Sequence, residues 1–153
     1  MARQPKQIHV FLYRKRNGQY EYALFQRSDL LTCWQGVCGG LEGSETVEQG
    51  ARREIFEEAG ISEKLPLYSM ECVSYIRANV FGPRTMARWG KETVVVPIYY
   101  FAMPFEGEVV LSEEHTAVEW LPYGAAYSRL YFEDQQTALY ELNERLLRRL
   151  LPD

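Results

Sequence analysis

The chain has 153 residues, of which 46% are apolar and 25% are charged, the balance of a globular protein rather than of a disordered or fibrous one. Seventeen Lys and Arg against 21 Asp and Glu give a net charge of −4, so the chain lacks the basic excess typical of a nucleic-acid-binding protein. A chain of this length can bury enough surface to fold without a disulfide or a structural metal.

The first part of the chain predicts a β-hairpin. Residues 8–13 are rich in β-forming side chains, and Asn17-Gly18 is a strong signal for a tight turn into a return strand at residues 20–26. The next segment, residues 28–43, contains four glycines and has the composition of turns, so we expect a glycine loop there.

Residues 46–59 predict a helix. Thr46 and Gln49 have the spacing of a capping box, and Gly60 stands where a helix-ending glycine belongs. An apolar stripe at i, i+4 and i+8 would pack this helix on a sheet; it consists of Val47, Ala51 and Ile55.

The second part of the chain predicts strands and a final helix. Residues 67–77 and 92–105 read as strands, and the second is apolar on both faces, which favours a central position in the sheet. Residues 108–111 and 116–121 predict shorter strands. The helix expected at 135–150 has a leucine stripe, Leu139, Leu142, Leu146 and Leu150, which would form core or the seam of a homodimer. With no repeat and no linker, residues 1–153 predict one α/β domain whose mixed sheet is covered on both faces.

Cysteine usage and hydropathy indicate a cytoplasmic protein. Cys33, Cys38 and Cys72 are odd in number and lack paired metal-site spacing, so we expect reduced thiols. Residues 1–7 are polar, without the apolar segment of a signal peptide. The longest uncharged run, Thr93–Phe105, is shorter than the roughly 20 residues of a membrane helix, so no membrane partner is expected.

The predicted helix at 46–59 is unusually acidic on one side. Glu54, Glu57 and Glu58 fall within an arc of about 100°, beside the apolar stripe. Such carboxylates repel one another, and the only basic residues on this helix are Arg52 and Arg53. A hard divalent cation such as Mg²⁺, which prefers oxygen ligands, would make the cluster favourable.

Residues 39–61 match the pattern G-x5-E-x7-R-E-U-x-E-E-x-G-U, where U is apolar, at every fixed position. This pattern is the Nudix box, and the chain resembles the Nudix hydrolases. The resemblance implies an α/β/α sandwich and hydrolysis of a nucleoside diphosphate linked to another group, with Mg²⁺ or Mn²⁺. Glu54, Glu57 and Glu58 match the metal-binding glutamates, and Arg53 matches the arginine that orients them, with Glu45 as its expected partner. A backbone carbonyl of Gly39, or of Cys38, would join the metal.

The same resemblance leaves two candidates for the general base that takes a proton from water, Glu54 and Glu114. Glu114 lies in a predicted loop before the strand at 116–121. Several Nudix proteins place an additional metal-binding or proton-accepting glutamate in such a loop, so Glu114 is a candidate for both roles.

Beyond the box, the chain is most similar to bacterial dATP and dihydroneopterin triphosphate pyrophosphohydrolases. The shared positions are Gln26-Arg27, the run from Trp34 to Gly39, Glu92, Glu114-His115 and Trp120-Leu121. This resemblance implies hydrolysis of a small nucleoside triphosphate-like substrate to the monophosphate and pyrophosphate. A dinucleoside polyphosphate hydrolase, and a nucleotide-sensing Nudix module without activity, remain the alternatives.

Four residues are candidates for substrate binding: Arg27, Lys6, Cys38 and Arg77. By the resemblance, Arg27 would lie near the phosphates, and Lys6 could supply a second cation there. Arg77 begins the segment 77–91, which holds several cations, Phe81, Trp89 and no acid before Glu92. Such a segment could close over a substrate as a loop hinged at Gly82 and Gly90.

Overall fold

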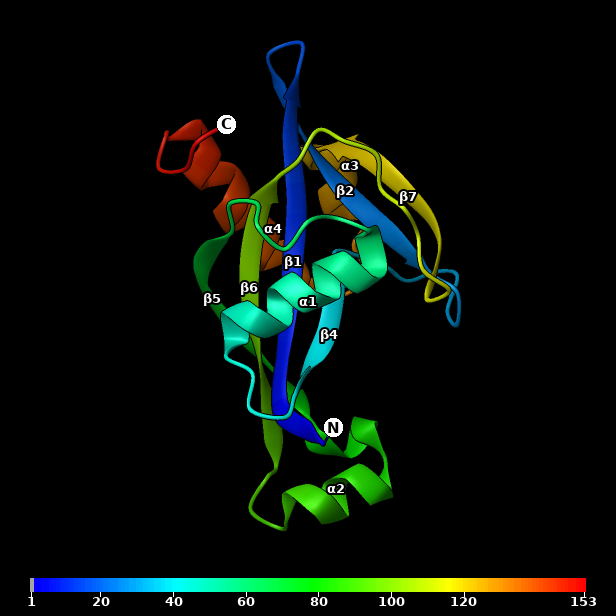
Figure 1. Ribbon diagram of the computed structural model, residues 1–153. Helices are drawn as coiled ribbons and strands as arrows, with labels where there is room; N and C mark the ends of the chain where they lie inside the picture. The colour runs from blue at the N-terminus through cyan, green and yellow to red at the C-terminus, as the bar shows by residue number, and fades with distance from the viewer. Residues whose placement is uncertain (1) are drawn as a thin grey trace.

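The computed structural model describes residues 2–153 as a mixed α/β structure built around one seven-stranded sheet (Figure 1). The strands are β1 (Arg3–Arg16), β2 (Gln19–Arg27), β3 (Trp34–Gln35), β4 (Val37–Glu42), β5 (Tyr68–Arg77), β6 (Val95–Pro104) and β7 (His115–Pro122). The helices are α1 (Val47–Ala59), the 3₁₀ helix η1 (Ala78–Phe81), α2 (Pro83–Trp89), α3 (Tyr123–Arg129) and α4 (Glu133–Leu147). The expected α/β class and mixed sheet are confirmed.

The sheet has the order β3-β2-β1-β6-β5, with β4 also paired to β1 and β7 to β2. All of these pairs are antiparallel except β1 with β6. Strand β1 has three partners, namely β2, β4 and β6. Strand β6 lies between β1 and β5, so its expected interior position is confirmed. At the β1–β2 turn, Asn17 and Gly18 have φ of 53° and 74°, the two positive values that a type I′ hairpin turn requires.

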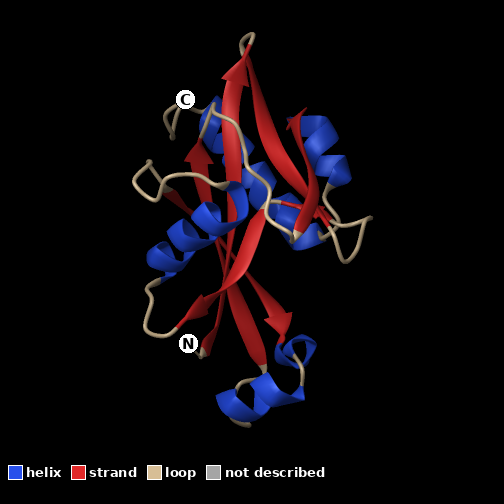
Figure 2. Ribbon diagram, turned by 45° about the vertical axis from the view of Figure 1, so that its right-hand side comes forward, coloured by secondary structure: helices blue, strands red, loops and turns tan. Residues whose placement is uncertain are grey.

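Helices cover both faces of the sheet (Figures 1 and 2). Helix α1 packs on one face through Ala51, Ile55 and Ala59, all fully buried. Helices α3 and α4 pack on the other face, where Leu139, Leu142 and Leu146 are buried. Leu150 was expected to continue this stripe, but it is 61% exposed because α4 ends at Leu147.

Local signals fix the ends of α1 as predicted. The Thr46 hydroxyl accepts a hydrogen bond from the Gln49 amide at 3.2 Å, and the Gln49 side chain accepts one from the Thr46 amide at 2.9 Å. Gly60 ends the helix in the left-handed region, with φ of 68°. These two caps set where the acidic face begins and ends.

The glycine-rich segment was interpreted wrongly as a loop over its second half, because it forms β3 and β4. Gly36, Gly39 and Gly40 permit close approach of neighbouring groups, and Gly43, with φ of 57°, makes a turn. A Cβ at Gly36 would lie 2.5 Å from the Val10 carbonyl oxygen, and one at Gly39 would lie 2.1 Å from Glu54 Cδ. Composition alone does not distinguish a glycine required by a turn from one required by a neighbour.

Two further segments differ from expectation. Residues 108–111 are not a strand; they run past the end of α1, where the Val110 amide donates to the Ala59 carbonyl at 2.9 Å. The cationic segment 77–91 is not an extended loop, because it forms η1 and α2, with Gly82 and Gly90 as the helix boundaries. Helix α3 was not anticipated from the sequence.

All three cysteines are free, and Cys33 is buried, so the expectation of reduced thiols near the core is confirmed. Within residues 2–153, no helix has both the length and the apolar character needed to cross a membrane.

Helix α4 protects part of the β5 edge of the sheet. The Glu141 carboxylate accepts hydrogen bonds from the backbone amides of Glu71 and Cys72, at 2.7 and 2.8 Å, and from Arg145 Nε at 2.7 Å. Burial acts to raise the pKa of Glu141, but these hydrogen bonds outweigh it and the pKa is lowered. The carboxylate therefore serves as an acceptor for an otherwise unpaired strand edge.

We predict that Glu141→Ala lowers the free energy of unfolding by about 1–2 kcal/mol, because two backbone amides lose their acceptor. In thermal unfolding, the melting temperature should fall by about 2–4 °C for each kcal/mol that is lost. Glu144→Ala on the same helix removes an ion pair with Arg148 at 2.9 Å, and it should cost less than about 1 kcal/mol. Equal losses in the two variants would contradict the role of Glu141.

Candidate functional site

Helix α1 presents two buried glutamates to the strand that precedes it. Glu54 and Glu58 lie four residues apart, hence one above the other, and are only 8% and 3% exposed. Glu57 lies on the same side of the helix but is largely exposed. Charged glutamates are almost never this buried without a partner, so the pair is the first sign of a functional site.

Gly39 on β4 makes the site possible. Its missing side chain leaves room for the Glu54 carboxyl group, whose Cδ and two oxygens would lie 2.1, 2.3 and 2.6 Å from a Cβ at this position. No side chain tolerates contacts this short. The Glu54 carboxyl group of α1 therefore lies directly against the β4 backbone at Gly39.

Arg53 organises the outer part of the acidic cluster. Its Nε donates to Glu45 Oε2 at 2.7 Å, and its Nη1 lies 3.0 Å from both Glu54 Oε1 and Glu57 Oε2. Its Nη2 donates to the Gly40 carbonyl at 2.8 Å, which ties the helix to β4. The hydrogen bond from Arg53 lowers the pKa of Glu45. Arg53 therefore contacts Glu45 and two of the three helix glutamates, as the family resemblance implied.

Glu58 has no such partner. Its Oε2 is buried and makes no hydrogen bond within residues 2–153. Burial first, and then hydrogen bonding and charge from the neighbouring Glu114 and Glu54 carboxyls, raise the pKa of Glu58 to about 11. Burial also raises the pKa of Glu54 to about 7, although Arg53 opposes this shift. A charged Glu58 therefore needs a cation beside it.

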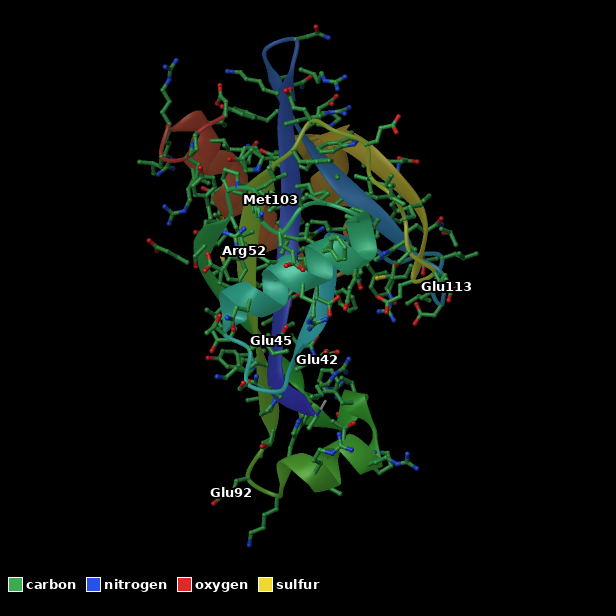
Figure 3. All side chains as sticks on the ribbon, viewed as in Figure 1. Glu42, Glu45, Arg52, Glu92, Met103 and Glu113 are labelled. Atoms are coloured by element: carbon green, nitrogen blue, oxygen red, sulfur yellow. The ribbon has the colours of Figure 1, made fainter. Side chains whose placement is uncertain are left out.

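The loop before β7 brings Glu114 to this cluster from a distant part of the sequence. Glu114 lies close enough to contribute to the raised pKa values of both Glu54 and Glu58. Its neighbour Glu113 is labelled on that loop in Figure 3, while Glu42 and Glu45 mark the opposite end of the site, where β4 meets α1. The Glu114 carbonyl accepts the Ser28 amide at 2.9 Å, which anchors the loop to the end of β2.

The residues present fit a hard divalent cation. Glu54 and Glu58 offer carboxylate oxygens, of which Glu58 Oε2 is buried and unpaired, and oxygen ligands of this kind are those that Mg²⁺ prefers. Within residues 2–153, no three acidic, histidine or cysteine side chains are already arranged as a complete ligand set.

The four candidate substrate residues lie at different distances from the cluster. Cys38 is next to Gly39, and burial raises the pKa of its thiol well above the ordinary value. Arg27 pairs with His115 across β2 and β7, beside Glu114, but its guanidinium is bound to Asp29 at 2.5 and 2.8 Å. Lys6 is exposed on β1. Arg77, at the end of β5, is separated from β4 by β6 and β1, so the structure does not bring it to the glutamates.

The structure also assigns buried positions to the two histidines. His9 is fully buried, and its Nε2 accepts a hydrogen bond from the Gly36 amide at 3.1 Å. Burial lowers the pKa of His9 to about 3. Burial likewise lowers the pKa of His115. A hollow of about 630 Å³ between the β1–β2 hairpin and the end of α4 contains none of the candidate site residues.

Comparisons with known proteins identify the family of this chain. The chain matches the NUDIX domain over residues 5–143. It is 29% identical to a dihydroneopterin triphosphate diphosphatase of Escherichia coli over 147 residues, covering 92% of this chain and 95% of the relative. It is also 29% identical to an asymmetrical bis(5'-nucleosyl)-tetraphosphatase of Sus scrofa, covering 86% and 88%.

Solved structures give the same relationship. A crystal structure from Listeria monocytogenes, described as a NUDIX hydrolase, superposes with a TM-score of 0.83 at 34% identity, covering 95% of this chain and 97% of that one. The E. coli dihydroneopterin triphosphate pyrophosphohydrolase superposes with a TM-score of 0.73 at 25% identity, covering 94% and 99%.

Proposed function

The chain belongs to the Nudix family of hydrolases that cleave phosphoric anhydride bonds, and from this premise we propose that it hydrolyses a small nucleoside triphosphate-like substrate to the monophosphate and pyrophosphate. The substrates proposed are dATP, another (d)NTP or dihydroneopterin triphosphate. The observation that carries the proposal is the meeting of Glu54, Glu58 and Glu114 against the glycine strand. Similarity over nearly the whole length of a dihydroneopterin triphosphate diphosphatase supports the substrate class.

Each residue has a proposed part in this reaction. Glu54, Glu57, Glu58 and Glu114, with the Gly39 carbonyl, would hold Mg²⁺ or Mn²⁺, which supplies charge neutralisation and Lewis acidity at the phosphates. Glu54 or Glu114 takes the proton from the attacking water. Arg53 keeps Glu54 and Glu57 in place through its hydrogen bonds.

The phosphate chain itself needs cations from the protein. Arg27 lies beside the Glu114 loop and would exchange its bond to Asp29 for a phosphate oxygen. Lys6 is a second proposed phosphate ligand, and Cys38 would line the path to the cleaved bond. Arg77 would serve only a part of the substrate that extends across the sheet.

Two alternatives have support of their own. Hydrolysis of a dinucleoside polyphosphate is supported by the similarity to the Sus scrofa tetraphosphatase. A nucleotide sensor without activity would require binding but no product. The buried Glu58 argues for catalysis, because an uncompensated carboxyl in the protein interior reduces stability and has no use in a passive binding site.

The proposal predicts release of pyrophosphate and a monophosphate only in the presence of Mg²⁺ or Mn²⁺. The test is a panel of dNTPs, dihydroneopterin triphosphate, diadenosine polyphosphates and ADP-ribose, with products identified by mass, and EDTA should abolish turnover. Cleavage of diadenosine tetraphosphate without cleavage of any triphosphate would favour the first alternative. Tight binding without product would favour the sensor.

A further inference from the structure

A row of residues crosses four strands next to Gly39, on the opposite face of the sheet from α1. Strand register aligns Gly40 of β4 with Gln7 of β1, Gln7 with Ile98 of β6, and Ile98 with Ser74 of β5. Ile98 packs with the core under α4, so the row faces away from α1. Gly40, Gln7, Ile98 and Ser74 form the cross-strand row.

This row lies in a gap between the elements that cover this face. Along β6, the neighbours of Ile98 on the same face are fully covered, with Val96 0% and Tyr100 1% exposed. Helix α4 begins over Tyr100, whose hydroxyl donates to Asp134 at 3.2 Å, while α2 lies at the lower end of the sheet, where Trp89 Nε1 donates to the Arg3 carbonyl at 2.7 Å (Figure 1). Gln7, Ile98 and Ser74 are all partly exposed to solvent. The row is therefore accessible, whereas Val96 and Tyr100 on either side of Ile98 are covered.

Two hydrogen-bond donors converge at the β4 end of the row. A Cβ at Gly40 would lie 2.9 Å from both Arg3 Nε and Gln7 Nε2, so both nitrogens lie close to this glycine. Gln7 Nε2 is buried and has no hydrogen-bond partner within residues 2–153. The Arg3 guanidinium lies over the Phe81 ring, 5.5 Å from its centroid. A buried donor without an acceptor is costly, which points to an acceptor supplied by a ligand.

The row adjoins the acidic cluster through a single peptide step. Gly39 faces Glu54 on one side of β4, and Gly40 faces Gln7 and Arg3 on the other. A substrate whose phosphates meet the glutamates can therefore extend its organic group around the edge of β4 onto the row. Ile98 offers an apolar surface for a planar ring there, with the two donors at the end nearer to the phosphates.

Two donors that lie over the same glycine favour a ring edge with two neighbouring acceptors. A 6-oxopurine presents O6 and N7 in this way, and a 4-oxopteridine presents O4 and N5, whereas adenine has an amino donor in place of the oxygen. We propose that the cross-strand row binds the heterocycle of the substrate, with Gln7 and Arg3 donating to its acceptor edge, and that Gln7 determines a preference for oxo-heterocycles over adenine. This inference rests on the proposed function and names the substrate within it.

The test compares dGTP and dihydroneopterin triphosphate with dATP, in the wild type and in Gln7→Leu. In the wild type, kcat/KM for dGTP and dihydroneopterin triphosphate should exceed that for dATP by about 10-fold or more, the usual effect of one pair of hydrogen bonds that distinguishes two bases. Gln7→Leu should lose most of this preference through KM, with little change in kcat. Gln7→Glu, which replaces the donor by an acceptor, should shift the preference towards dATP.

Gln19→Leu is the matched control, since Gln19 is an exposed strand residue at the far end of the β1–β2 hairpin and should keep wild-type ratios. A wild type that prefers dATP, or a Gln7→Leu variant that keeps the wild-type ratios, would overturn the inference. Titration with unreactive α,β-methylene analogues of dGTP and dATP gives the same comparison without turnover. Oxo-selective binding without hydrolysis would refute the proposed function alone, and hydrolysis without selectivity would refute this inference alone.

Discussion

Glu58→Gln is expected to lower kcat by at least about 100-fold while the protein remains folded. The substitution keeps the shape of the side chain but removes the charge that a divalent cation would need at the centre of the cluster. Glu58 is suited to this test because it is buried and, unlike Glu54 and Glu57, is not bound to Arg53. Pyrophosphate release under saturating Mg²⁺ measures the effect directly.

The same variant should be no less stable than the wild type when metal is absent. The pKa of Glu58 is raised from 4.5 to about 11, so the folded protein retains a proton that the unfolded chain releases above pH 4.5. Stability of the metal-free wild type therefore falls as pH rises from about 4.5 towards 11, and Glu58→Gln removes this loss. In thermal unfolding with EDTA, the melting temperature of the variant relative to that of the wild type should rise from pH 5 to pH 7 and again from pH 7 to pH 9.

Glu48→Gln provides the control on the same helix. Glu48 is exposed and forms an ion pair with Arg52 at 3.3 Å, away from the acidic cluster. Its loss should change kcat by less than about twofold. Mg²⁺ should raise the melting temperature of the wild type and of Glu48→Gln but not that of Glu58→Gln. If Glu58→Gln kept near wild-type turnover, or gained equally from Mg²⁺, the metal assignment would be wrong.

Local chemistry accounts for the parts of the structure that the sequence predicts well. The Asn17-Gly18 turn needs two positive φ values that few other residue pairs allow, and the α1 caps need only side chains within three residues. The i, i+4 spacing of Glu54 and Glu58 likewise places them on one face of a helix, whatever the exact residues at which the helix begins and ends. Each of these features depends on neighbours in the sequence, so the sequence contains all the information that they require.

The features that were missed depend on contacts between distant segments. Gly36 and Gly39 look like turn glycines until β1 and α1 are placed against them. Residues 108–111 have the composition of a strand, yet they bond to the end of α1 instead of to the sheet. The donors at Arg3 and Gln7 become apparent only once β1 and β4 are in register, and a register shift between these two residues hides the pattern. Tertiary contacts overrode local preference in each case.

Glu114 and Arg27 were named from the sequence, but their surroundings depend on the fold. Family resemblance suggested both residues, but only the fold brings Glu114 to Glu58, across the 55 positions that separate 58 from 114 along the chain. The fold also shows that Arg27 is already bound to Asp29. A phosphate would have to compete with that carboxylate, which spacing along the sequence could not reveal.

Gly39→Ala is the second change expected to have a large effect, on both activity and stability. A Cβ there would lie 2.1 Å from Glu54 Cδ, less than any real carbon contact, so either the Glu54 side chain rotates away or α1 moves off β4. We expect a loss of about 1–3 kcal/mol in unfolding free energy from the overpacking. We also expect a fall of about 100-fold in kcat, because a displacement near 1 Å misaligns a catalytic group.

Gly124→Ala separates this effect from the general cost of replacing glycine. Gly124 lies in α3 with nothing within 4 Å of a new Cβ, so alanine should stabilise the helix by about 0.5–1 kcal/mol and leave kcat unchanged. Combining Gly39→Ala with Glu54→Asp shortens the acid by one methylene and should recover part of the lost stability but not the activity, because the carboxyl no longer reaches the same point. Full activity in Gly39→Ala would mean that the Glu54 carboxylate does not act from the position it occupies against β4.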